Sequence, residues 1–310
     1  MPPNMSVLAP LPAQREPLEI VSSWDLEIPY QQFRAQHLVP SSLVTLLPEF
    51  PGITRIYVIA NQKGGAGKTT TAMELAAAWV AMGYTVRVID SDPQFSLSGW
   101  LKPIYPEDMD PRDRRELTDV FYGRCTLDEA TYYTRFKNLY VVPCTADLAL
   151  VELDSRVGKD NALRKAIAAS QAPIDITIID SPPALGKLSV NGLTAANQVF
   201  VPLKVGALDT KGLTDLHTTI RAVQDDTNPS LVVRAAFLTA WKRSEYARTV
   251  AERVRTDYPE AAVFTIRESI RAAEAPDHGM PVREFDPVGT TAADYDQAGR
   301  ILLAPKEITA

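Results

Sequence analysis

The segment IANQKGGAGKTT holds three glycines and two lysines within a few positions. Gly64, Gly65 and Gly67 can adopt backbone conformations that a β-carbon forbids, so successive N–H groups can turn toward one anionic group. Lys68 would add a positive charge there, and the Thr69 hydroxyl is a suitable ligand for Mg²⁺. An apolar run precedes the loop and an Ala-rich segment follows it. This order of strand, loop and helix predicts a phosphate-binding loop.

The loop departs from the general pattern G-x-x-x-x-G-K-[ST] at its start, where Gln62 replaces the first glycine and Lys63 follows. The string KGGAGKTT resembles the deviant phosphate loop of the ParA and MinD family of ATPases. The resemblance implies that ATP and Mg²⁺ are the cofactors, and that Lys63 reaches across a dimer to the partner's nucleotide. It also implies that Lys63 and Lys68 act in catalysis. By the same resemblance the nucleotide contacts the whole loop: Lys63, Gly64, Gly65, Ala66, Gly67, Lys68, Thr69 and Thr70.

Carboxylates follow two of the apolar runs, in VRVIDSDPQ and in DITIIDSPP. Because ligands of open α/β folds bind at the carboxyl ends of the strands, these side chains are expected beside the loop. The family resemblance implies that Asp90 and Asp180 join Thr69 in the magnesium environment. It further implies that Asp92 orients or deprotonates the attacking water, as phosphoryl transfer requires. Alternatively, Asp92 and Pro93 only end the strand with a turn.

Seven short β-branched runs alternate with helical segments from residue 55 onward. They are RIYVIA, VRVID, LYVVP, DITIID, QVFVPL, VVRAAFL and AVFTI. Runs that are apolar on both faces are typical of a parallel sheet covered by helices, and right-handed crossovers then give a doubly wound fold. We expect a three-layer α/β domain with a mostly parallel sheet of about seven strands, a P-loop, and helices on both faces.

The chain divides into an extension, a main domain and a short tail. Residues 1–52 form a Pro-rich extension, because nine of the 24 prolines lie there and proline interrupts both helices and strand ladders. The ATPase domain is expected over 53–305, followed by a tail at 306–310. Within the domain, 102–137 turns polar and is expected to be an insertion-like helical cap outside the core.

The composition excludes several classes of protein. A formal net charge of −6 gives no overall signal for a nucleic acid or an anionic membrane, so any DNA contact must come from a local patch. Two cysteines are too few for a disulfide framework and lack the spacing of a metal site. No stretch approaches the ~20 apolar residues of a membrane span. We expect a cytoplasmic protein without a membrane partner.

Basic residues gather in the carboxyl half, within WKRSEYARTVAERVR and RESIR. The apolar stripe of the helix expected over 244–258 would turn its arginines outward. The resemblance favours DNA phosphates as their partner, with Arg243 and Arg271 as the main contacts, and such binding would not depend on sequence. A solvated face with weak ion pairs is an equally weighted alternative.

The family resemblance extends from about residue 53 to the end of the chain. In the last part, AAEAPDHGMPVREFDPVGTTAADYDQAG matches the family block at Glu274, Ala275, Gly279, Pro281, Asp286, Pro287 and Tyr295. One departure precedes this block: Arg267 and Glu268 follow Ile266, where the family has I-P-R near the adenine.

The resemblance implies an ATP-dependent dimerising switch with weak ATPase activity. The ATP-bound homodimer would bind double-stranded DNA non-specifically, associate with the nucleoid, and drive plasmid or chromosome partition with a ParB-like centromere-binding protein. A related ATPase that positions a protein cargo would have the same core and remains open.

Two other classes are less favoured. A MinD-like membrane protein should end in a basic amphipathic helix, whereas KEITA follows Pro305. An enzyme such as the nitrogenase iron protein or dethiobiotin synthetase could use a similar loop. For the former, Cys125 and Cys144 do not resemble cluster ligands.

Overall fold

The computed structural model describes residues 55–154, 159–207 and 210–303, so the extension at 1–52 and the tail at 306–310 lie outside the described residues. One sheet of eight strands crosses this part of the chain, in the order β3-β4-β2-β5-β1-β6-β7-β8. The strands are β1 (Arg55–Ile59), β2 (Val86–Asp90), β3 (Tyr132–Tyr133), β4 (Leu139–Val142), β5 (Ile176–Asp180), β6 (Gln198–Lys204), β7 (Val232–Trp241) and β8 (Ala262–Arg267). Every neighbouring pair is parallel except β3 with β4.

All seven expected strands are present, and the three-layer doubly wound fold is confirmed. The eighth strand, β3, was not expected, because it is only two residues long and follows a polar segment. It forms the edge of the sheet and pairs with β4 through Tyr132 opposite Val141 and Tyr133 opposite Tyr140.

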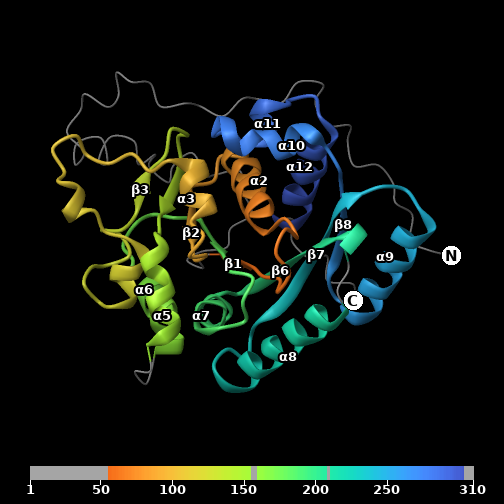
Figure 1. Ribbon diagram of the computed structural model, residues 1–310, viewed down its shortest axis with the longest axis horizontal. Coiled ribbons are helices and arrows are strands. Elements are labelled where there is room, and N and C mark those ends of the chain that lie inside the picture. The colour runs from red at the N-terminus through yellow and green to blue at the C-terminus, as the bar shows by residue number, and fades with distance from the viewer. Residues whose placement is uncertain (1–54, 155–158, 208–209, 304–310) are drawn as a thin grey trace.

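Helices cover both faces of the sheet (Figure 1). One apolar core lies under α2 (Lys68–Ala81), α3 (Ser96–Leu101), α10 (Ile270–Glu274), α11 (Val282–Phe285) and α12 (Thr290–Leu303). The other lies under α4 (Leu117–Phe121), α5 (Ala149–Leu153), α6 (Ala162–Ala169), α7 (Lys187–Ala195), α8 (Thr210–Asp226) and α9 (Glu245–Asp257). Strand side chains alternate between the two cores, Val58 facing one and Ile59 the other, as the pleat of a strand requires. No helix among the described residues is long and apolar enough to cross a membrane.

The segment 102–137 differs from the polar cap that was expected. Residues 102–116 are exposed or partly exposed, but Leu117 and Phe121 of α4, and Leu127 after it, are buried in the core. The expectation that the whole segment lies outside the core is therefore wrong. The apolar residues are spread among charged ones, so their common burial depends on a chain path that local sequence does not specify.

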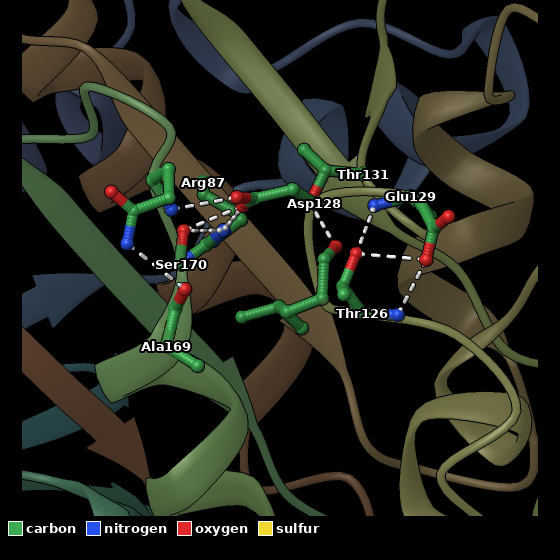
Figure 2. Close-up of polar contacts among 9 residues, drawn as sticks. Arg87, Thr126, Asp128, Glu129, Thr131, Ala169 and Ser170 are labelled. Atoms are coloured by element: carbon green, nitrogen blue, oxygen red, sulfur yellow. Dashed lines mark hydrogen bonds and ion pairs between the residues drawn. The ribbon is translucent and has the colours of Figure 1, made fainter.

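A buried ionic cluster attaches this segment to the rest of the domain (Figure 2). Arg87 of β2 is buried and forms an ion pair with Asp128, with Nη1 to Oδ1 at 3.3 Å. Ser170, at the end of α6, accepts from Arg87 at 3.1 Å and donates to Asp128 at 2.5 Å. Burial lowers the pKa of Arg87 to about 10, and Asp128 opposes that change. The cluster lies toward the amino end of β2, three positions before Asp90.

Buried polar contacts fasten α2 to the carboxyl-terminal helices. The hydroxyl groups of Thr71 and Tyr295 are 2.9 Å apart, and Glu74 Oε1 accepts from Val282 N at 2.6 Å. Trp79 Nε1 donates to the carbonyl of Gly299 at 3.0 Å. The helix that follows the glycine loop is therefore fixed by three contacts along its length.

Candidate nucleotide site

The glycine loop joins the carboxyl end of β1 to α2, as predicted. Gly65 and Gly67 have φ of 70° and 92°, in the left-handed region that glycine adopts without strain. Gly67 caps α2, and its carbonyl accepts from Thr71 N at 2.8 Å. Gly64 and Gly65 are exposed, and a β-carbon at either would meet open space. The loop backbone thus faces solvent beside the positive end of a helix, which suits an anion.

Lys68 begins α2 and is buried, whereas Lys63, Thr69 and Thr70 are partly exposed. The Lys68 ammonium donates a long hydrogen bond of 3.4 Å to the carbonyl oxygen of Lys63, so the side chain of one predicted lysine contacts the backbone of the other. Burial lowers the pKa of Lys68, and the charges of Asp180 and Asp92 oppose this change. A cation in such surroundings is stabilised by any further negative charge brought to the loop.

Asp180 ends β5 and lies opposite Ile59 of β1, so it stands directly beside the loop. Burial, together with the charge of Asp90, raises the pKa of Asp180 to about 8, while Thr69 and Lys68 oppose the rise. Neither carboxyl oxygen receives a hydrogen bond of good geometry from a described residue. Buried polar atoms rarely lack a hydrogen-bond partner, and a hard cation that takes oxygen ligands would satisfy these two oxygens. The donor set fits Mg²⁺.

Asp90 ends β2 and is the register partner of Asp180 on the adjacent strand. Its Oδ2 accepts from both the backbone N and the hydroxyl of Ser98 at 2.7 Å, and its Oδ1 accepts from Asp92 N at 3.3 Å. Burial raises the pKa of Asp90 to about 6, and the Ser98 bonds oppose that rise. Asp90 therefore fixes α3 against the sheet, and its place in the magnesium environment stays a prediction.

The family model described as an AAA domain matches residues 54–233. The chain is 34% identical over 253 residues to the chromosome-partitioning ATPase Soj of Treponema pallidum, a match that covers 80% of this chain and 96% of that one. It is 38% identical over 238 residues to the chromosome partitioning protein ParA of Caulobacter vibrioides, covering 75% and 87%. This chain is a member of the ParA family of ATPases. The resemblance noted in the sequence is thereby confirmed.

Solved structures share the fold of this ParA family member. A protein described as cobyrinic acid a,c-diamide synthase from Mycobacterium smegmatis, with bound ADP and magnesium, is 32% identical with a TM-score of 0.66, covering 81% of this chain and 94% of that one. A complex of a Cyanothece McdA variant with ATP has a TM-score of 0.69 at 22% identity, covering 83% and 99%, which shows the fold alone.

Asp92 lies in the turn after β2 and is partly exposed. Its Oδ1 accepts from Gln94 N at 3.0 Å, and its carbonyl accepts from Phe95 N at 2.8 Å and from Cys144 Sγ at 3.1 Å. The turn that was the alternative interpretation is present, but it keeps the carboxyl group at the edge of the sheet. There its charge acts on both Lys68 and Asp180. The role of Asp92 toward water stays a prediction.

The segment after Asp180 is held at both ends. The hydroxyl of Ser181 donates to the carbonyl of Ile59 at 2.7 Å. At the other end, the carboxylate of Glu152 in α5 accepts from Lys187 N at 2.7 Å and from Leu188 N at 3.1 Å, the first amides of α7. A β-carbon at Gly186 would collide with that carboxylate in its present position, so a larger residue there would displace the Glu152 side chain. Glu152 was missed in the sequence, because no local motif links it to α7.

Many of the basic residues of the carboxyl half are engaged in ion pairs. Arg271 is 3.6 Å from Glu274 and stacks over Phe285 at 4.2 Å, although its side chain stays 55% exposed. Arg267, at the departure from the family pattern, binds both carboxyl oxygens of Asp294 at 2.9 and 2.5 Å. Within the basic segments 241–255 and 267–271, the arginines that are exposed and form no ion pair with another described residue are Arg243, Arg248 and Arg255.

Proposed function

We propose that this ParA family member is an ATP-dependent dimerising switch with weak, Mg²⁺-dependent ATPase activity. In its ATP-bound dimer it would bind DNA non-specifically, on the nucleoid in the cytoplasm, and drive plasmid or chromosome partition with a ParB-like adaptor. The observation that carries the nucleotide part is the buried carboxyl group of Asp180 beside the glycine loop and Lys68. Its oxygens receive no hydrogen bond of good geometry from the described residues. The names of the relatives, which are chromosome partitioning proteins, support the partition role.

The residues of the site have separate roles in this proposal. The amides of 64–70 and the Lys68 ammonium bind the phosphates, while Thr69 and Asp180 hold Mg²⁺, with Asp90 behind them. Bound Mg²⁺ would neutralise charge that develops on the phosphates. Asp92 orients the attacking water from the turn after β2. Lys63, partly exposed at the rim, reaches the nucleotide of a second protomer.

The DNA surface is proposed to centre on the amino end of α9. Arg243 precedes this helix and Arg248 lies in its second turn, and both are exposed without an ion pair to another described residue. Arg271 can join them only if a phosphate competes with Glu274 for its guanidinium. Arg243 therefore ranks before Arg271. The net charge is −6, so DNA binding would rest on this local basic patch, and a dimer would present two such patches.

The test is a DNA-binding titration with two unrelated duplexes, in ATP, ADP or no nucleotide, at low and moderate salt. We expect equal binding of both duplexes in ATP only, falling steeply as salt rises. Arg243→Gln and Arg248→Gln should weaken binding several-fold. Arg253→Gln is the matched control, since it removes the same charge from α9 but Arg253 is already paired with Asp257 at 2.8 Å.

Two outcomes would contradict the proposal. If a confirmed ATP dimer binds neither duplex, the DNA role fails and a protein cargo becomes the better explanation. If Arg253→Gln weakens binding as much as Arg248→Gln, the surface is not the one named here. Saturable turnover of ATP without any DNA or protein partner would leave the ATPase assignment standing in either case.

A further inference from the structure

The end of β7 is tied to the glycine loop by one buried side chain. The hydroxyl of Thr239 donates to the carbonyl oxygen of Ala66 at 2.9 Å. The loop follows β1, whereas Thr239 belongs to β7, and β6 lies between these two strands in the sheet. The contact therefore reaches the loop from a strand that β1 does not touch.

The backbone of β7 is distorted where this contact is made. Ala240, the next residue, has φ of 52°, in the left-handed region that costs a residue with a β-carbon roughly 1–2 kcal/mol. The register between β7 and β8 shifts between Leu238 and Trp241, around the same residue. Such irregularities bend a strand and turn its side chains in new directions, often next to functional sites. Here the distortion accompanies a threonine hydroxyl that is directed at the loop.

Thr239 also limits the space around Gly67. A β-carbon at Gly67 would lie 3.3 Å from the Thr239 methyl group, so the methyl packs closely on the loop while the hydroxyl holds its carbonyl. A second anchor comes from β6 through Asn61, whose amide donates to the carbonyl of Pro202 at 2.5 Å and accepts from Lys63 N at 3.1 Å. The loop is thus held at its start from β6 and at its end from β7.

The direction of the Ala66 carbonyl decides where the next amide points. In a planar trans peptide the C=O and the following N–H point in opposite directions. Because Thr239 holds the Ala66 oxygen toward β7, the N–H of Gly67 is directed away from β7, toward the open side of the loop. That amide precedes Lys68 and belongs to the group expected to face phosphate.

We propose that Thr239 is a positioning residue for nucleotide binding, because it orients the peptide between Ala66 and Gly67 so that the amide is ready for phosphate before the nucleotide arrives. This inference rests on the proposed ATP site, but not on DNA binding or partition. Its loss should weaken ATP and ADP alike, since both carry a phosphate in the loop.

Three variants test the proposal, with nucleotide affinity measured by calorimetry in the full chain and turnover measured separately. Thr239→Val keeps the shape but removes the hydroxyl, and we expect a loss of about five- to tenfold in affinity for both nucleotides. Thr239→Ser keeps the hydroxyl and should restore affinity to within twofold of wild type. Thr177→Val is the matched control, since Thr177 is a buried strand threonine whose hydroxyl has no hydrogen-bond partner among the described residues.

The results separate this inference from the proposed function. Unchanged affinity in Thr239→Val overturns the positioning role, as does an equal loss in Thr177→Val or in Thr239→Ser. Wild-type protein that binds ATP but not DNA contradicts the partition proposal. In that case the nucleotide affinities of Thr239→Val and Thr239→Ser still test the positioning role of Thr239. Wild-type protein that binds no nucleotide would overturn both.

Discussion

Asp90 and Asp180 are register partners on neighbouring parallel strands, yet their carboxyl groups have opposite surroundings. Asp90 accepts three hydrogen bonds from Ser98 and Asp92, whereas neither oxygen of Asp180 receives one of good geometry from a described residue. Asp180 lies on the strand next to β1, and Asp90 lies one strand farther from the glycine loop. Asp90 binds the backbone around the site, whereas the carboxyl oxygens of Asp180 are available to coordinate a cation.

Replacement of Asp180 by Asn should stabilise the nucleotide-free protein. Burial raises the pKa of Asp180 to about 8, so this carboxyl group must take up a proton when the protein folds at neutral pH. Asn avoids that cost, and we expect a gain on the order of 1–3 kcal/mol in the free energy of unfolding. The same change should reduce the Mg²⁺-dependent part of ATP affinity at least tenfold, because a ligand oxygen is lost. Denaturant unfolding without nucleotide and ATP titrations with and without Mg²⁺ measure the two effects.

Asp90→Asn is the matched comparison and should act in the opposite direction on stability. Asn has a single acceptor oxygen, so its NH₂ group must face either the two Ser98 donors or the Asp92 N–H, and a loss of about 1–3 kcal/mol is expected. If both variants change stability in the same direction, the difference in surroundings is not what distinguishes the two carboxylates.

Substitution of the two loop lysines should have different effects on ATP binding and dimerisation. Lys68→Ala removes the buried cation at the start of α2 and should abolish ATP binding. Lys63→Ala should leave ATP bound but prevent the dimer, because its side chain acts on a second protomer. Sedimentation analysis with ATP and with a slowly hydrolysed analogue measures the association. A wild-type protein that stays monomeric under saturating ATP with slowed hydrolysis would contradict the role given to Lys63.

Asp92→Ala should block turnover while leaving ATP and the dimer in place. Only the orientation of the attacking water is lost in this variant, so kcat should fall by about two orders of magnitude or more with little change in affinity. Product release measured in a single turnover, together with sedimentation, distinguishes a trapped dimer from a weak binder. Unchanged turnover would assign the water to another residue.

Glu74 should make stability depend on pH. Burial raises the pKa of Glu74 to about 8, while the amides of Val282 and Arg283 and the Arg283 charge oppose the rise and Asp296 adds to it. Because this pKa is above the unfolded value, the folded state binds more protons through the window between them. Stability from this group is therefore present at low pH and lost as pH rises toward about 8.

Glu74→Gln removes this proton-linked loss. We expect the variant to gain stability over wild type by a few kcal/mol as pH rises from about 5.5 to about 8.5, with a smaller difference at the acidic end. Unfolding midpoints of both proteins across this range measure the difference. A difference that does not change with pH would show that Glu74 has the same proton affinity in the folded and unfolded chain.

The sequence predicts the parts of this fold that depend on local pattern. Apolar runs predict the seven long strands, and the glycine string predicts the loop and its helix, since both signals lie within a few residues. The strand β3 was not predicted because two tyrosines are too few to show an alternating or apolar strand pattern. The roles of Thr239, Asn61 and Glu152 were not predicted for another reason. Each side chain binds a backbone group far away in the sequence, and an isolated polar residue does not indicate its partner.

The sequence also could not show which basic residues are available for DNA. Charge alone could not separate Arg271, which the fold engages with Glu274 and Phe285, from Arg243, which has no ion-pair partner among the described residues. Arg267 of β8, at the departure from the family pattern, pairs with Asp294 of α12, a contact that the local sequence does not reveal. Pairing across the fold, rather than the number of arginines, decides which guanidinium groups remain available for phosphate.

The fastening of α2 to the end of the domain has a consequence for protein synthesis. Thr71 and Glu74 meet Tyr295 and Val282 across 224 and 208 positions of sequence. A growing chain that has released α2 from the ribosome therefore lacks the groups that hold this helix in place. Prematurely terminated products would therefore bind ATP poorly. Because dimerisation is proposed to require ATP, they would not form inactive dimers with full-length protomers.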